Sequence, residues 1–208
     1  MEVVIATEEH LKYAETIAKM MEVAAKERGT GIAKRSVEYL QKKINEGKAV
    51  ISIDGENVAG FCYIESWGHD KYVANSGLIV NSNYRKMGLA KKIKSKVFAL
   101  STKKFPDSKI FGITTSLAVM KINAELGYQP VTFSELTDDE QFWKGCQTCK
   151  NFDILTRTER SHCLCTGMLF DPKKAKETKK ESTTDRWQSF KRFVKLKGLK
   201  AKRILVKK

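Results

Sequence analysis

Apolar residues in this chain gather in short β-branched runs or recur every three or four positions. Short runs bounded by turn residues predict strands, whereas the longer spacing predicts amphipathic helices. The order β-α-α-β-β-β-α-β-α-β-β combines hairpins with crossovers, which predicts an α/β or α+β sheet covered by helices. The predicted strands are 3–6, 49–53, 58–64, 73–80, 109–114, 151–155 and 166–170, and the predicted helices begin near Thr7, Ser36, Leu89 and Ser116.

The most informative segment joins the predicted strand at 78–80 to the helix from Leu89 through the loop Arg85-x-x-Gly88-x-Ala90. A helix start leaves backbone N–H groups unpaired and carries partial positive charge, so it attracts anions. Gly88 and Ala90 are small, which lets a phosphate approach the backbone closely. Neither a P-loop nor the Gly-x-Gly-x-x-Gly fingerprint of dinucleotide-binding domains is present.

This loop after a buried strand resembles the pyrophosphate-binding loop of the GNAT acyltransferases, which bind acetyl-CoA. The resemblance extends to Thr114-Thr115 and Leu126-Gly127-Tyr128 and covers about residues 2–170. It implies a mixed, mostly antiparallel sheet whose strand before the loop splays from its neighbour and pairs with the pantetheine arm. It also implies an acyl-CoA-dependent N-acyltransferase. The CoA-binding residues that it implies are Leu78, Ile79, Val80, Arg85, Lys86, Met87, Gly88, Leu89, Ala90 and Lys91.

Within that superfamily, segments 31–36, 111–116 and 126–131 and the Cys146-x-x-Cys149 pair are similar to short, kinase-free bacterial N-acetylglutamate synthases. This implies an acetyl transfer to the amine of glutamate or a related amino acid in arginine biosynthesis. Alternative acceptors are another small amine or a protein amine, and the donor is acetyl-CoA or another acyl-CoA. The acceptor would be bound by Arg35, which can clamp a carboxylate, and by the hydroxyls of Thr114, Thr115 and Ser116. The competing interpretation is a surface ion pair for Arg35 and a simple helix cap at Ser116.

The chain departs from the family where the leaving thiolate is usually protonated. The family often has a Tyr there, four residues before the Gly of Leu-Gly-Tyr, and this chain has Asn123. Asn cannot deliver a proton, so the hypothesis is direct transfer with the thiolate stabilised by hydrogen bonds. The family also commonly has an acidic residue on the strand before the loop. The matching position in this chain is Ala74 or Asn75, and neither is an acid.

The nearest candidate base is Glu65, at the end of the third predicted strand. A solvated strand-end carboxylate is the competing interpretation. His69 in the following loop is a further candidate, although a lone loop histidine is commonly just exposed. Tyr63 is assigned to the core.

The predicted strands 151–155 and 166–170 would form a closing hairpin. Four cysteines form a second feature, because Cys146-x-x-Cys149 and Cys163-x-Cys165 would lie at the two ends of this hairpin. Four thiolates could hold a structural, tetrahedral zinc ion. The alternatives are buried free thiols and a redox pair. Cys62 alternates within an apolar strand and is assigned to the core.

The net charge of +15 is concentrated at the end of the chain. Residues 171–208 hold 15 Lys/Arg and 4 Asp/Glu, so residues 1–170 contribute only +4. We therefore expect a catalytic domain at 1–170 and a basic tail at 171–208, made of a linker and an amphipathic helix at 186–197. That helix could bind a membrane, nucleic acid or an acidic partner, or it could dock on its own domain.

No apolar run is long enough to span a membrane, and five cysteines without a signal-peptide layout predict a cytoplasmic protein. A third hypothesis belongs to another class. Because the acid and the Tyr of the family are absent, the domain could be a non-catalytic CoA-binding module that recruits a polyanion through its tail.

Overall fold

A computed structural model describes residues 1–28, 34–147 and 149–175. Met1–Asp171 form one compact unit. The predicted tail helix at 186–197 lies outside the described residues. The elements are β1 (Glu2–Ile5), α1 (Ala14–Arg28), α2 (Val37–Asn45), β2 (Ala49–Asp54), β3 (Asn57–Trp67), β4 (Tyr72–Val80), α3 (Leu89–Lys104), β5 (Lys109–Thr114), α4 (Leu117–Glu125), β6 (Gln129–Val131), α5 (Glu140–Lys144), α6 (Phe152–Arg157) and β7 (Thr166–Phe170), with 3₁₀ turns at Glu8–Tyr13, Ser82–Tyr84 and Phe133–Glu135.

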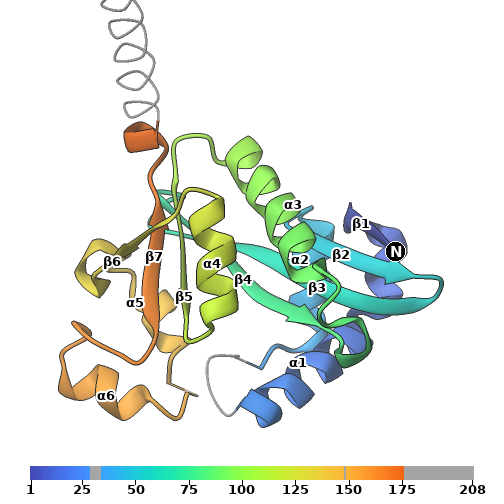
Figure 1. Ribbon diagram of the computed structural model, residues 1–208, viewed down its shortest axis with the longest axis horizontal. Helices are drawn as coiled ribbons and strands as arrows, with labels where there is room; N and C mark the ends of the chain where they lie inside the picture. Colours follow the sequence, from blue (N-terminus) through green and yellow to red (C-terminus); the bar gives the residue numbers. More distant parts are fainter. Residues whose placement is uncertain (29–33, 148, 176–208) are drawn as a thin grey trace, which may run out of the picture. The chain divides into compact units, whose positions relative to one another are not determined.

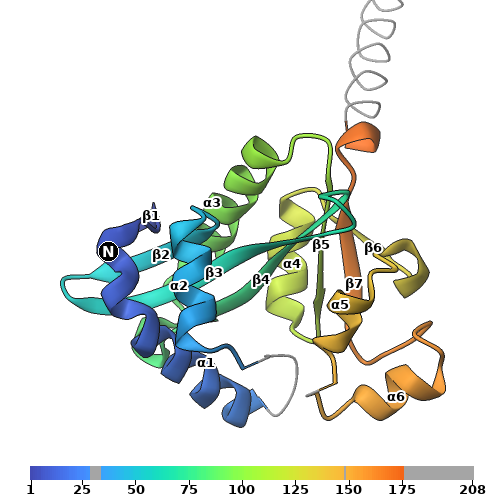
Figure 2. The same ribbon diagram turned by 180° about the vertical axis from the view of Figure 1, so that it is seen from behind.

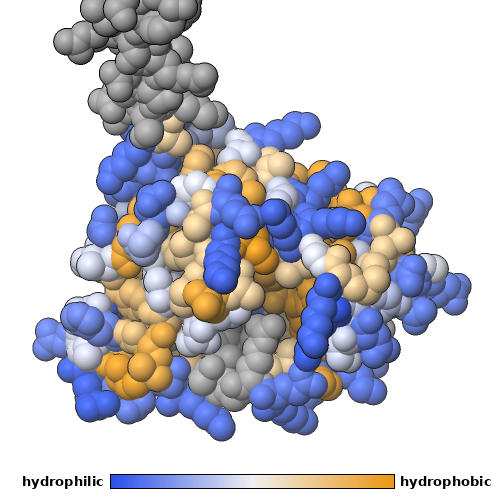
Figure 3. Space-filling model, viewed as in Figure 1, coloured by the Kyte–Doolittle hydropathy of each residue, from blue (hydrophilic) through white to orange (hydrophobic). Residues whose placement is uncertain are grey.

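The seven strands form one sheet in the order β1-β2-β3-β4-β5-β7-β6, and only β4 and β5 pair in parallel. Helices α3 and α4 cover one face of the sheet (Figure 1), and α1 and α2 cover the other (Figure 2). Hydrophilic and hydrophobic side chains are interspersed over the face that carries α3 and α4 (Figure 3). The predicted mixed, mostly antiparallel α/β class is therefore confirmed.

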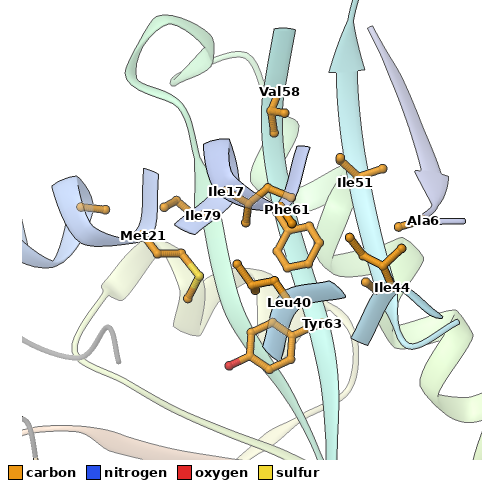
Figure 4. Close-up of a cluster of buried hydrophobic side chains, with 13 residues drawn as sticks. Ala6, Ile17, Met21, Leu40, Ile44, Ile51, Val58, Phe61, Tyr63 and Ile79 are labelled. Carbon is orange, nitrogen blue, oxygen red and sulfur yellow. The ribbon is translucent and has the colours of Figure 1, made fainter. Parts of the chain in front are cut away.

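Buried side chains pack on both faces of the sheet. In Figure 4, Ile17 and Met21 of α1 and Leu40 of α2 lie against Phe61 and Tyr63 of β3. On the opposite face, the apolar stripe of α3 packs against the alternate side chains of β3 and β4. Each buried Leu, Ile or Phe side chain contributes about 1.5–3 kcal/mol, so both helix layers are held mainly by burial of apolar surface.

The prediction of a strand at 151–155 was wrong, because this segment begins helix α6. Phe152 and Leu155 are three residues apart, which puts both on one side of a helix. Leu155 is buried and Phe152 is partly buried in a cluster with Phe133 and Trp143. The partner of β7 at the sheet edge is instead β6, which the apolar pattern did not predict.

The two central strands diverge. Strand β4 pairs with β5 only through Tyr72, Val73 and Ala74. Beyond Ala74, β4 pairs with β3 alone while β5 continues beside β7. Among the described strands, none therefore lies beside one backbone edge of β4 from Asn75 onward.

A bulge bends β4 at the divergence. Phe61 pairs with Ile79 and Tyr63 with Ser76, so two β4 residues lie opposite the single residue Cys62. One of the two is Gly77, whose φ is +65°, a value that L-residues seldom adopt. A Cβ atom there would lie 2.3 Å from the Tyr63 ring. Glycine is thus required for both the backbone conformation and the space.

We expect Gly77→Ala to lower the free energy of unfolding by about 2–4 kcal/mol, because it adds a left-handed penalty to a clash with Tyr63. Urea denaturation followed by circular dichroism measures the change. The matched control is Gly68→Ala, where φ is +57° but the nearest atom to a new Cβ is 3.8 Å away. Equal losses in the two variants would contradict the proposed clash.

Candidate active site

A cavity of about 850 Å³ lies where β4 and β5 diverge. Its walls include Ala74–Leu78 of β4 and Phe111–Thr114 of β5. Side chains from α1, α3, α4, α5 and α6 also reach it, together with Arg35 from the segment before α2. Because the unpaired edge of β4 forms part of this wall, its backbone groups can bond to an extended ligand.

The loop between β4 and α3 ends at a helix start that has no side-chain cap. Gly88 is the N-cap residue of α3, with φ +72° and no side chain to cap the helix. The first amides of the helix therefore lack an intrahelical partner, and the first turn holds no acidic residue. Tyr84 ties the loop to the β2–β3 hairpin, since its hydroxyl donates to Asp54 Oδ2 at 3.1 Å.

The basic side chains of this loop are exposed. Arg85 bonds Glu27 of α1 at 2.8 Å, and Lys91 pairs with Glu125 of α4 at 2.7 Å. Exposed pairs of this kind contribute about 0–1 kcal/mol, so a bound phosphate can replace them. Lys86 has no ion pair with another described residue. The predicted CoA loop thus combines uncapped amides with exchangeable positive charge.

Arg35 faces the cavity beside two tyrosines. Its Nε donates to the Tyr63 hydroxyl at 2.8 Å, and its guanidinium lies 5.1 Å from the centre of the Tyr39 ring. Burial raises the pKa of Tyr63, although the Arg35 charge opposes this effect, so the hydroxyl stays neutral. Arg35 has no carboxylate partner among the described residues, which leaves its positive charge for a ligand.

Glu65 lies behind this pair and does not line the cavity. Its carboxylate accepts a hydrogen bond from the Tyr39 hydroxyl and pairs with Lys43 Nζ at 2.7 Å. The carboxylate therefore anchors Tyr39, on which Arg35 stacks. A role for Glu65 as base stays a prediction, and the geometry gives this residue a positioning role. His69 lies in an exposed loop with φ +55° and does not line the cavity either.

Of the other predicted site residues, some line the cavity and some do not. Asn123 lines the cavity and is 1% exposed, and its buried Oδ1 has no hydrogen-bond partner in the described part of the chain. Thr114 also lines it, and its Oγ1 accepts from the Ser116 amide at 3.1 Å. Thr115 and Ser116 follow at the start of α4 and do not line the cavity. The structure thus brings Arg35, Thr114 and Asn123 to one cavity.

The far wall of the cavity is aromatic. The ring of Phe142 lies 5.2 Å from that of Trp67 and 5.0 Å from that of Phe111, both edge-on. Phe133 and Phe152 extend the same wall. Such a surface favours an apolar ligand group over a charged one.

Cys146, Cys149, Cys163 and Cys165 line the cavity next to this aromatic wall. No three His, Cys, Asp or Glu side chains among the described residues are arranged to hold a metal ion. Burial raises the pKa of Cys146 to about 11 and that of Cys165 to about 12, so both thiols are neutral at pH 7. The structure therefore gives no support to the predicted zinc site, and the four cysteines are free thiols.

Known proteins match this chain through the fold and not through the sequence, since no family model and no curated protein matches. An acetyltransferase of the GNAT family from Staphylococcus aureus aligns with a TM-score of 0.56 and 13% identity over 82% of this chain and 98% of that one. This is the GNAT fold. The predicted resemblance is confirmed at the level of the fold.

Two further structures with the GNAT fold contain relevant ligands. N-acetylglutamate synthase from Neisseria gonorrhoeae, complexed with coenzyme A and N-acetyl-glutamate, aligns with a TM-score of 0.58 and 16% identity over 82% of this chain. The aligned part is about a third (34%) of that enzyme. A putative acetyltransferase from Salmonella typhimurium with its cofactor acetyl-CoA aligns with a TM-score of 0.58 and 13% identity, covering 83% of this chain and 94% of that one.

Two cavity residues of this GNAT fold were missed at the level of sequence. Tyr63 was assigned to the core, and it is indeed 1% exposed, but its hydroxyl bonds the cavity-facing Arg35. Lys94 lies in a lysine-rich helix and was not singled out. A signal existed for Lys94, since it is four residues from both Ala90 and Phe98 and so lies on an inward face of α3.

Among the described helices, none is long and apolar enough to cross a membrane.

Proposed function

We propose that this protein is an acyl-CoA-dependent N-acyltransferase that moves an acetyl or related acyl group to the amine of a small acceptor. The observation that carries the proposal is the unpaired β4 edge, which leads from the uncapped start of α3 into the cavity. The fold neighbours that hold CoA or acetyl-CoA support the same donor.

The donor would bind as an extended arm. Amides of Met87 to Ala90 hold the pyrophosphate, and the edge of β4 bonds the pantetheine amides. The thioester then lies near Gly77 to Ile79, beside the cavity. The neutral acceptor amine attacks the thioester carbonyl, the C–S bond breaks, and the amine proton leaves to water or a base.

Arg35 supports an acceptor that carries a carboxylate, with glutamate or a related amino acid of arginine biosynthesis as the leading candidate. A guanidinium that has no carboxylate partner among the described residues can bind the carboxylate of a ligand. The aromatic wall formed by Trp67 and Phe142 favours a second candidate, an amino acid with an apolar side chain.

A mass-spectrometric turnover assay tests the proposal. The purified full chain is mixed with acetyl-CoA or succinyl-CoA and with glutamate, phenylalanine, leucine, ornithine, polyamines and a basic peptide. We expect an acylated amino acid, and its identity decides between the two candidates. Product only from polyamine or peptide would discard the carboxylate acceptor. Tight CoA binding without any product would favour the non-catalytic module.

The predicted polyanion binding by the tail and the predicted cytoplasmic location remain proposals. Binding of the full chain to an RNA or to anionic vesicles, compared at two salt concentrations, tests the first. A steep loss of affinity with salt is the expected signature of contacts between basic residues and phosphates.

A further inference from the structure

Lys94 is a buried lysine without a counter-charge. It lies on α3 and is 2% exposed, yet it lines the cavity where β4 and β5 diverge. No ion pair or hydrogen bond of Lys94 Nζ occurs among the described residues. An ammonium without compensation is costly to bury, so a lysine at this position is more consistent with a ligand than with a structural role.

The groups that surround Lys94 do not neutralise it. Its Nζ lies 5.4 Å from the centre of the Tyr128 ring, whose quadrupole attracts a cation. From β3, the Cys62 thiol faces it and donates to the Ser76 carbonyl at 3.2 Å. Burial raises the pKa of Cys62 to about 11, so this thiol is neutral at pH 7. From β4, Asn75 contributes only an amide, which bonds Ser101 and Tyr128.

The leaving thiolate needs a hydrogen-bond donor at this point of the cavity. Asn123 on α4 is poorly suited, because its Nδ2 donates to Met168 Sδ at 3.7 Å and its Oδ1 is an unpartnered acceptor. A carboxamide oxygen cannot donate a hydrogen bond to a thiolate. Lys94 lines the same cavity as Ser76 to Leu78, and its ammonium has three donors and a positive charge.

We propose that Lys94 is the general acid of the acyl transfer and donates a proton to the CoA sulfur as the C–S bond breaks. This inference rests on the proposed function. The acceptor nitrogen forms the new C–N bond and loses its own proton to water or a base. The CoA thiolate takes the proton from Lys94 Nζ, and solvent protonates the lysine again after CoA leaves.

The acidity of Lys94 suits this role. Burial lowers its pKa to about 8, an effect that the Cys62 sulfur partly opposes. At pH 7 the amine is therefore protonated, yet it gives up its proton more readily than an exposed lysine. A general acid works best when its pKa is near the working pH. We expect turnover to fall as the pH rises above about 8, when Lys94 loses its proton.

The first experiment needs no acceptor. CoA and desulfo-CoA are bound in separate samples to wild-type protein and to Lys94→Met. For each protein, the absorbance of the desulfo-CoA complex is subtracted from that of the CoA complex, which leaves the thiolate absorbance of the bound CoA. This subtraction removes the signal of the five protein thiols. We expect the bound CoA thiol of the wild type to titrate at least about one pH unit below that in Lys94→Met. Identical titrations would overturn the role of Lys94 while leaving CoA binding, and hence the proposed function, intact. Absence of CoA binding to the wild type would overturn both.

The second experiment measures turnover with the acceptor found by mass spectrometry. We expect Lys94→Met to lower kcat about 100-fold with a nearly unchanged Kd for CoA, and to abolish the loss of rate above pH 8. Lys94→Arg keeps the charge but holds its proton, so it should lower the pKa of the CoA thiol without restoring kcat. The matched control is Lys96→Met, an exposed lysine two residues further along α3. Unchanged kcat in a folded Lys94→Met protein would overturn the inference.

Discussion

Replacing Gly88 with glutamate is expected to weaken CoA binding about 100-fold, from the loss of roughly 2.7 kcal/mol of charge-assisted hydrogen bonding. Gly88 is the N-cap of α3, and nothing lies within 4 Å of a Cβ placed there. A glutamate side chain therefore has room to turn its carboxylate onto the free amides of the first helical turn. It would occupy the pyrophosphate site and repel the phosphates as well.

Backbone strain is the competing cause, since Gly88 has φ +72°. Gly55→Glu controls for it, because Gly55 in the β2–β3 hairpin has φ +59° and equally open space around a new Cβ. Gly88→Ala adds strain without charge. Isothermal titration with CoA should show the large loss only for Gly88→Glu. A similar loss in Gly88→Ala would attribute the effect to the backbone or to the added methyl group, whereas an unchanged affinity in Gly88→Glu would remove the pyrophosphate from this loop.

The sequence was sufficient to predict the strand, loop and helix around Gly88, because there the local pattern and the tertiary structure agree. The β-branched run before Arg85 and the apolar stripe after Gly88 each follow a clear period. At 151–155 the pattern was ambiguous, since the apolar residues Phe152 and Leu155 suit one face of a helix while Ile154 also suits a strand. The helix is favoured because it packs Phe152 and Leu155 against the aromatic cluster of Phe133 and Trp143.

The site was less predictable because its residues meet only in the folded chain. Arg35 and Thr114 were found through the resemblance, and both line the cavity. Glu65 was chosen by its place at a strand end, but its partners Tyr39 and Lys43 come from α2, which no local pattern reveals. Lys94 lies in a run of lysines, most of which are exposed, and its spacing from Ala90 and Phe98 was the one local sign that it faces inward.

Removing the guanidinium with Arg35→Met should raise the KM for a carboxylate-bearing acceptor about 10- to 100-fold while changing kcat little. A hydrogen bond to a charged group contributes about 1.5–3 kcal/mol, and Arg35 would make its bonds in both the ground state and the transition state. Met fills the space of the Arg35 stem against Tyr39, which limits the effect on packing. The affinity for CoA should remain unchanged, because the loop at Gly88 is separate from Arg35.

The decisive comparison is between an acceptor and its amide, in which the carboxylate charge is removed. If Arg35 binds that carboxylate, the wild type should prefer the acid strongly, and Arg35→Met should treat the two alike. Arg157→Met, which alters an exposed arginine paired with Asp153 and outside the cavity, should keep the preference. An equal loss for acid and amide in Arg35→Met would mean that the guanidinium only supports Tyr63 and Tyr39. Arg35 would then not recognise the acceptor carboxylate. The aromatic wall would be the remaining candidate for selecting the acceptor, through an apolar side chain.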